Sequence, residues 1–265
     1  MAHSDDSHTS MSQTTEPFDE NEVSIGRPPG EPPPFIHEYS GTVCLHFNQD
    51  EVQSAMYKHA PDELVLSYTR TMMNFLVFKQ QPRHVGMIGL GGGSMPKYCY
   101  RRLPDTTISV AEINPEVIAL RDRFLIPKDD QRFMVYCEDG ADFVQRQPGH
   151  FDVLLVDGFD HKGQPPQLCS ERFYSDCYRA LTSPGLLIVN VCDGRDLISR
   201  IRRCFRNQVN LADAHDDTAN IIVFASKGGI PAAPRSSPRT ARIAQRLPAQ
   251  QRARLNDGFE EKQSL

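Results

Sequence analysis

The segment His84–Ser94 constrains the fold of this chain more than any other. It reads His-Val-Gly-Met-Ile-Gly-Leu-Gly-Gly-Gly-Ser, an apolar run followed by a cluster of glycines that includes Gly89 and Gly91. This pattern predicts a buried strand that opens into a tight loop, where glycine backbone adopts positive φ and approaches a ligand closely. The glycine cluster alone is weakly specific, because many ordinary turns are rich in glycine.

A carboxylate at a fixed distance strengthens this interpretation. About twenty residues after the glycines, the short apolar segment Ser109-Val-Ala-Glu112 ends in an acid. In a doubly wound α/β fold the glycine turn lies against a nucleotide or nucleoside, and the acid after the second strand accepts ribose hydroxyls. Glu112 in isolation would be a solvated acid at a strand end; after this glycine turn, ribose binding is the better hypothesis.

From His84 onward, apolar strands alternate with amphipathic helices. The predicted strands are Val85–Ile88, Thr107–Ala111, Phe133–Cys137, Val153–Val156, Leu186–Val191 and Ile221–Ala225. The predicted helices are Ser94–Arg101, Pro115–Phe124, Ala141–Gln145, Ser170–Ala180 and Leu197–Arg203. Such alternation predicts an α/β fold with a doubly wound, mostly parallel sheet that helices cover on both faces.

A small β-rich piece precedes this domain, with a predicted hairpin of Thr42–Phe47 and Glu51–Met56 and a helix over Leu64–Phe78. The chain therefore divides into four predicted parts: a disordered acidic and proline-rich tail (1–38), a hairpin-and-helix lead-in (39–82), a nucleoside-binding α/β domain (83–226) and an arginine- and proline-rich C-terminal tail (227–265). Within the last part, Thr240–Leu255 is compatible with a short surface helix.

Composition excludes several classes of function. The formal net charge of −5 disfavours nonspecific nucleic-acid binding. No run approaches the roughly 18 apolar residues that cross a membrane, and the N-terminus lacks the features of a secretory signal. The seven cysteines are scattered, odd in number and without a C-x-x-C pair. They predict reduced thiols, a cytoplasmic protein and no zinc site.

Further acids follow the third and fourth predicted strands. Asp139, followed by Gly140, is placed to accept a hydrogen bond from an adenine amine, although Asp-Gly is also a common turn. Asp157 and Asp160 follow the apolar strand Phe151–Val156, where two acids can bind an ammonium and one can take its proton. The alternative is that both acids serve only backbone amides, as caps or turn residues.

Taken in order, these segments resemble the spermidine synthase (polyamine aminopropyltransferase) family from about Tyr39 to Ala225. The resemblance is carried by the segments 89–94, 110–115, 138–140, 151–160 and 170–174. It implies a β-rich N-terminal piece before a methyltransferase-like α/β domain. It also implies spermidine biosynthesis: an aminopropyl group passes from decarboxylated S-adenosylmethionine to putrescine or a related amine, and methylthioadenosine is released.

The resemblance assigns a role to each candidate residue. It implies contacts with the nucleoside for Gln53, Gly89, Gly91, Glu112, Asp139 and Gly140. It makes Asp157 the catalytic proton acceptor and places Asp160 and Tyr68 in the amine site. It implies a small-molecule amine as partner, no metal, no prosthetic group, no nucleic acid and no membrane, with a homodimer as the assembly considered.

The sequence departs from the family pattern at three places. Gly92 stands where the family carries an aspartate for the donor's ammonium, and Tyr68-Thr69-Arg70 replaces a Tyr-His-Glu segment. The acid-pair loop continues as His161-Lys-Gly-Gln-Pro instead of proline followed by Gly-Pro. These departures keep two alternatives open: an S-adenosylmethionine-dependent methyltransferase, with Arg70 meeting the donor's carboxylate, or an inactive nucleoside-binding homologue. A non-enzymatic interaction protein is a third alternative.

Overall fold

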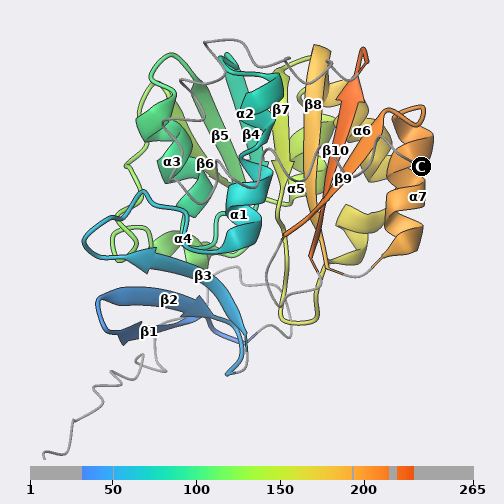
Figure 1. Ribbon diagram of the computed structural model, residues 1–265. Coiled ribbons are helices and arrows are strands. Elements are labelled where there is room, and N and C mark those ends of the chain that lie inside the picture. Colours follow the sequence, from blue (N-terminus) through green and yellow to red (C-terminus); the bar gives the residue numbers. More distant parts are fainter. Residues whose placement is uncertain (1–31, 50, 193, 215–219, 230–265) are drawn as a thin grey trace, which may run out of the picture.

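The computed structural model describes residues 32–49, 51–192, 194–214 and 220–229, and they form two sheets (Figure 1). The large sheet has seven strands in the order β6-β5-β4-β7-β8-β10-β9. The small sheet has three antiparallel strands in the order β1-β2-β3. The predicted tails, including the helix over Thr240–Leu255, lie largely outside the described residues.

The large sheet confirms the predicted fold class. Its strands are β4 (His84–Ile88), β5 (Thr107–Glu112), β6 (Phe133–Cys137), β7 (Phe151–Val156), β8 (Leu181–Val191), β9 (Val209–Asp213) and β10 (Ile221–Lys227). Strands β4 to β8 pair in parallel, whereas β10 runs antiparallel to both β8 and β9. The sequence prediction missed β9, whose residues are only partly buried and therefore lack a continuous apolar run.

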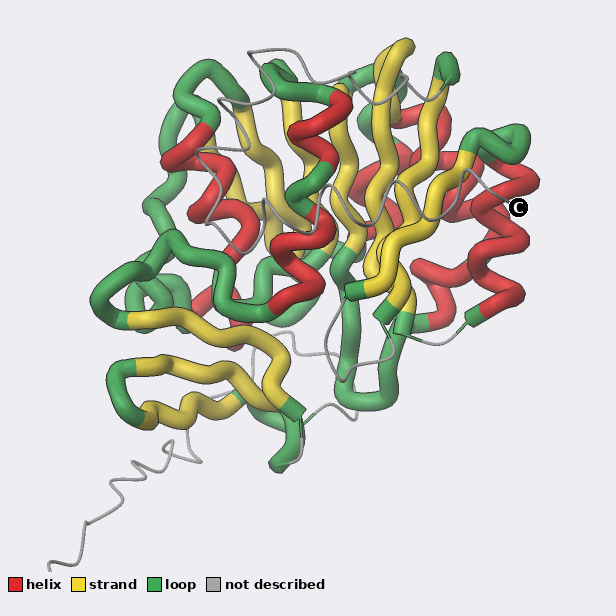
Figure 2. The backbone as a smooth tube through the Cα atoms, viewed as in Figure 1, coloured by secondary structure: helices red, strands yellow, loops and turns green. Residues whose placement is uncertain are grey.

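Helices cover both faces of this sheet, as Figure 2 shows. On one face lie α1 (Ser67–Met72), α2 (Phe75–Phe78), α3 (Ser94–Arg102) and α4 (Pro115–Ala119); on the other lie α5 (Gly140–Gln145), α6 (Glu171–Ala180) and α7 (Arg195–Cys204). Successive strand residues contribute to opposite apolar clusters: Val153 and Leu155 to the first, Leu154 and Val156 to the second. This alternation explains why the central strands read as continuous apolar runs.

The small sheet consists of β1 (Phe35–Tyr39), β2 (Thr42–His46) and β3 (Val52–Tyr57). It lies beside the lower edge of the large sheet in the view of Figure 1. Strands β2 and β3 agree with the predicted hairpin. Strand β1 was not predicted, and all of it except Tyr39 falls within the segment 1–38 that was predicted to be a disordered tail. The run of prolines before β1 is typical of a linker and gave no sign of a strand. Strand β1 forms because it pairs with β2.

Two predicted helices are shorter than their apolar patterns suggested. The pattern over Leu64–Phe78 yields α1 and α2, which are separated at Met73–Asn74. Helix α1 begins only at Ser67, because the carbonyls of Leu64 and Val65 accept from the Arg70 side chain at 2.7 and 2.5 Å and are diverted from a helical ladder. The helix predicted to reach Phe124 ends at Ala119. The Phe124 carbonyl instead accepts from the buried Lys97 Nζ at 2.7 Å.

The parallel strands place one set of loops at a common edge. The loops after β4, β5, β6 and β7 all begin at the carboxyl ends of neighbouring strands, where ligands bind in open α/β sheets. A short 3-10 helix, η1 (Pro166–Cys169), follows the loop after β7. Within the described part of the chain, no helix combines the length and hydropathy needed to cross a bilayer.

Candidate active site

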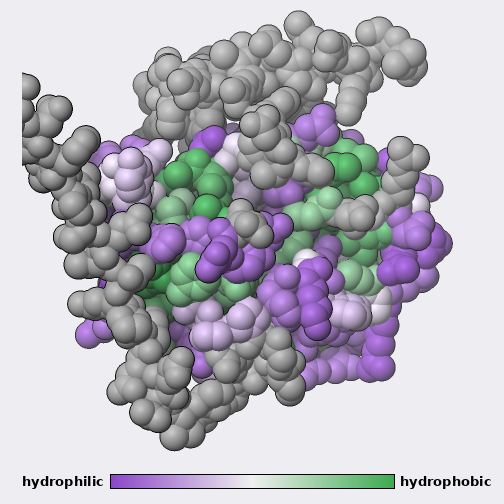
Figure 3. Space-filling model, turned by 90° about the horizontal axis from the view of Figure 1, so that it is seen from below, coloured by the Kyte–Doolittle hydropathy of each residue, from purple (hydrophilic) through white to green (hydrophobic). Residues whose placement is uncertain are grey.

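A cavity of about 240 Å³ opens at this carboxyl edge, between the loops of the large sheet and the inner face of the small sheet. The residues to which the family resemblance gives a binding or catalytic role all line it: Gln53, Tyr68, Gly89, Gly91, Glu112, Asp139, Gly140, Asp157 and Asp160. Figure 3 views the molecule from below and shows apolar surface between hydrophilic residues on this face. The fold thus gathers candidates that are spread over more than a hundred residues.

The glycine loop brings backbone close to the cavity. Gly89 has φ of +92°, and a Cβ added there would lie 2.3 Å from the backbone oxygen of Asp157. Gly91 also has positive φ, at +50°, and lines the cavity. A side chain at Gly89 would therefore push apart the carboxyl ends of β4 and β7, so glycine at this position holds the two loops in contact.

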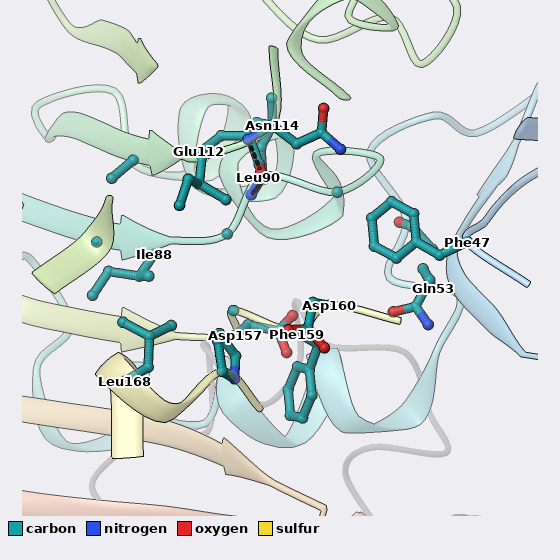
Figure 4. A pocket seen from close by; sticks show the side chains of 18 of the residues that line it. Phe47, Gln53, Ile88, Leu90, Glu112, Asn114, Asp157, Phe159, Asp160 and Leu168 are labelled. Carbon is teal, nitrogen blue, oxygen red and sulfur yellow. Dashed lines mark hydrogen bonds between the residues drawn. The ribbon is translucent and has the colours of Figure 1, made fainter. Parts of the chain in front are cut away.

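Glu112 ends β5 and is 9% exposed. Its Oε2 accepts from the backbone N–H of Leu90 at 2.8 Å, and its Oε1 accepts from the backbone N–H of Asn114 at 2.9 Å (Figure 4). These bonds tie the carboxylate to the glycine loop and fix its direction. Each carboxylate oxygen can accept more than one hydrogen bond, so this geometry leaves capacity for the hydroxyls of a ribose.

Asp139 has the capping contact that was the alternative to adenine binding, and it also lies at the cavity. Its Oδ1 caps α5 by accepting from the Ala141 N–H at 2.7 Å, and its Oδ2 accepts from Gln167 Nε2 at 3.3 Å. The residue nonetheless lines the cavity. Gly140 follows it, and a Cβ there would lie 2.4 Å from Ile88 Cγ2, so only glycine lets α5 begin this close to β4.

Asp157 lies on the opposite wall from Glu112, at the end of β7 (Figure 4). It is half-buried by surface area because it faces an open cavity, yet protein atoms crowd it closely. Burial raises its pKa to about 7, while hydrogen bonds from Asn190 and Tyr68 act in the opposite direction. The Asn190 Nδ2 donates to its Oδ1 at 2.9 Å. A carboxylate with a near-neutral pKa is suited to accept a proton at physiological pH.

Asp160 lies in the loop that follows Asp157. Its Oδ1 accepts from the Lys162 N–H at 2.7 Å, and its backbone pairs with Gly163 in an isolated bridge. The side chain therefore serves a turn, which was the alternative to amine binding, and it also lines the cavity. His161 and Lys162 line the cavity beside it.

The small sheet and α1 supply the outer wall. Gln53 from β3 and Phe47 after β2 face the acid pair across the cavity (Figure 4). Tyr68 reaches Asp157 from α1. Thr69 also lines the cavity, but its Oγ1 donates to the Leu66 carbonyl at 2.6 Å.

Two departures from the family pattern have a structural explanation. A Cβ at Gly92 would lie 2.7 Å from Ser54 Oγ and 2.8 Å from the Phe124 ring, so neighbouring side chains already fill the space of the missing aspartate. Arg70 does not line the cavity, and its guanidinium donates to backbone carbonyls before α1. The structure thus gives no support to a contact between Arg70 and a donor's carboxylate.

Sequence reasoning missed several residues that shape the site, among them Phe47, Asn114, Gln167 and Asn190. Asn190 carried a readable signal: it is a polar residue inside the apolar run Leu186–Val191, where a buried strand calls for an apolar side chain. Phe47 and Asn114 stand in loops and Gln167 in η1, and these side chains line the cavity only because of the tertiary fold.

Comparisons with known proteins agree with this geometry. A profile of the spermine/spermidine synthase domain matches residues 65–194. A polyamine aminopropyltransferase of Neisseria meningitidis is 38% identical over 205 residues, which cover 74% of this chain and 78% of that protein.

Two solved structures have the same fold. A probable spermidine synthase from Corynebacterium glutamicum superposes with a TM-score of 0.66 at 20% identity, over 81% of this chain and 83% of that one. A spermidine synthase in complex with the transition-state analogue AdoDATO superposes with a TM-score of 0.56 at 23% identity, over 78% of each chain.

Proposed function

This chain belongs to the spermidine synthase (polyamine aminopropyltransferase) family, and we propose that it transfers an aminopropyl group from decarboxylated S-adenosylmethionine to putrescine or a related amine. The observation that carries the proposal is the position of Asp157. It faces the cavity opposite Glu112, touches Tyr68 and has a pKa of about 7. One wall is thus suited to hold a nucleoside and the other to take a proton from an amine.

The nucleoside half of the proposed site consists of the glycine loop and the ends of β5 and β6. Glu112 accepts the ribose hydroxyls, and Asp139 with Gly140 lies against the adenine. Gly89 and Gly91 allow close approach of the glycine loop, and Gln53 closes the site from the small sheet. The tethering of Glu112 by two backbone N–H groups supports this assignment, because a fixed carboxylate loses little freedom on binding.

The chemical step in this proposal is a displacement at carbon. Asp157 accepts a proton from the ammonium of the incoming amine, which frees the lone pair of the nitrogen. That nitrogen attacks the methylene carbon next to the donor's sulfonium; the new C–N bond forms as the C–S bond breaks, methylthioadenosine leaves with the electron pair, and the product nitrogen keeps its remaining protons as a secondary ammonium. Tyr68 orients Asp157, and Asp160 attracts the ammonium form of the incoming amine.

The methyltransferase alternative has weaker support. It needs a group for the carboxylate of S-adenosylmethionine, and Arg70 was its candidate; the Arg70 guanidinium donates to backbone carbonyls instead. The second argument for a methyltransferase was that glycine stands at position 92 in place of the family's aspartate. The Phe124 ring and Ser54 fill that space, so this glycine follows from packing.

Calorimetry tests the proposal directly. The protein is titrated with decarboxylated and with ordinary S-adenosylmethionine, which differ by one carboxylate, and methylthioadenosine release is then followed with putrescine and with shorter and longer amines. We expect tighter binding of the decarboxylated donor and turnover with an amine. Tighter binding of ordinary S-adenosylmethionine, with no methylthioadenosine released, would overturn the assignment.

A further inference from the structure

Asn190 is a buried polar residue on β8, the strand next to β7. The pairing of Val156 with Val189 places it beside Asp157 in the parallel register. It is 2% exposed, and Ile188, two residues earlier on the same face, packs in the apolar cluster beneath α1. The position therefore calls for an apolar side chain.

Only one of the two polar atoms of the Asn190 amide has a hydrogen-bond partner among the described residues, and that partner is Asp157. Its Nδ2 donates to Asp157 Oδ1 at 2.9 Å, whereas its own Oδ1 is buried without a hydrogen-bond partner among the described residues. Leaving a buried polar atom unpaired costs stability. The opposite amide orientation would bring two oxygens together, so the orientation observed is the one that an ionised Asp157 requires.

We propose that Asn190 is a positioning residue for the amine transfer: its amide N–H holds the carboxylate of Asp157 ionised and directed into the cavity. The expected effect on turnover rests on the proposed function, whereas the hydrogen bond between Asn190 and Asp157 is a feature of the fold. Asn190 does not line the cavity, so it acts only through Asp157.

Several other titratable groups lie around Asp157, and each one is kept unchanged in the test. From the surrounding elements these are Tyr68 on α1, Asp160, His161 and Lys162 in the same loop, and Cys192 after β8. Glu112 and Asp139 face it from across the cavity. Among the causes that lower the pKa of Asp157 against burial, the bond from Asn190 comes first, before that from Tyr68.

The experiment compares Asn190→Leu, Asn190→Asp and Asn190→Gln with the parent in the full chain. Leucine has nearly the size of asparagine but no donor, so the acid limb of the pH profile of kcat/KM should move upward by about one pH unit. This is a tenfold change in proton affinity, or about 1.4 kcal/mol. Aspartate would place a second carboxyl beside Asp157, and the limb should move up further because like charges disfavour ionisation. Glutamine keeps the amide and should restore the parent profile.

A matched control and a second readout separate the possible failures. Thr182→Val changes a polar residue at the other end of β8, whose Oγ1 donates to Asp152 at 3.0 Å, and should leave the pH midpoint unchanged. The carbon-13 carboxyl signal of Asp157, assigned by its loss in Asp157→Asn, reports the same titration without any turnover.

An unmoved midpoint in Asn190→Leu and Asn190→Asp, or an equal shift in Thr182→Val, would overturn the inference. If leucine prevents folding, the aspartate variant alone decides. A parent without activity on any amine, but with the Asp157 signal shifted in Asn190→Leu, would contradict the proposed function and leave the role of Asn190 standing.

Discussion

Replacing Asp157 by asparagine should make the protein more stable while removing most of its activity. Burial raises the pKa of Asp157 from 3.8 to about 7, so the ionised form is held in the folded state at a cost. Because the folded pKa lies above the unfolded one, this cost is absent below about pH 4. It grows as the pH rises through the window between the two values and is complete above about pH 7. Asparagine has nearly the same size and no charge, and therefore avoids the cost.

The magnitude follows from the same two values. A rise from 3.8 to about 7 corresponds to about 4 kcal/mol of stability at alkaline pH. Water in the open cavity screens the carboxylate, so we expect on the order of 2 kcal/mol in practice. For a chain of this size that is a rise of about 4–8 °C in Tm. Loss of a general base should lower kcat by about 10²–10⁴-fold, while nucleoside binding stays nearly unchanged.

The assay is thermal unfolding of the parent and Asp157→Asn at pH 4.5 and at pH 8.5. The variant should melt close to the parent at the lower pH and clearly above it at the higher pH. A difference in Tm that does not grow with pH would refute the argument, because it would mean that the carboxylate is ionised in the fold at no cost.

Asp152→Asn on the same strand is the matched control, since it should show the opposite sign. Burial of Asp152 raises its pKa, but hydrogen bonds from Arg83, Lys79 and Thr182 outweigh burial and leave the pKa lowered. The ionised Asp152 therefore stabilises the fold at pH values above the pKa that this group has in the unfolded chain. This stabilisation is lost as the pH falls through the pKa of Asp152 in the folded protein. The Asp152→Asn variant should be less stable than the parent at pH 8.5, and the difference should shrink toward pH 3.

Three further predictions follow from individual contacts. Glu112→Gln should weaken methylthioadenosine binding about tenfold or more, equivalent to about 1.5–3 kcal/mol, in calorimetry; unchanged affinity would contradict the ribose assignment. Gly92→Asp should lower stability by about 1–3 kcal/mol, because its Cβ would overlap Ser54 and Phe124; a melting curve identical to the parent's would show that the site has room. Burial and the neighbouring His84 lower the pKa of His150 below 6.5, so acid should destabilise the fold below that pH, and His150→Gln should reduce this sensitivity.

The sequence by itself determined the parallel sheet and the main candidates of the site. Apolar runs from Val85 to Val191 alternate with helical patterns, and such alternation allows few arrangements other than a doubly wound sheet. Once the strands are parallel, acids that follow them must meet at one edge. Glu112, Asp139 and Asp157 could therefore be placed together from their positions in the sequence alone.

Only the tertiary structure decided what each of these groups does there. The pKa of Asp157 depends on burial and on Asn190, which lies 33 residues away in the sequence. Whether an acid would fit at Gly92 depends on the Phe124 ring, and the Arg70 guanidinium donates to two carbonyls of its own segment and does not line the cavity. These outcomes depend on which side chains become neighbours. Local patterning fixes which face of a strand or helix is apolar, but packing between distant segments sets the burial and hydrogen bonding of a given polar atom.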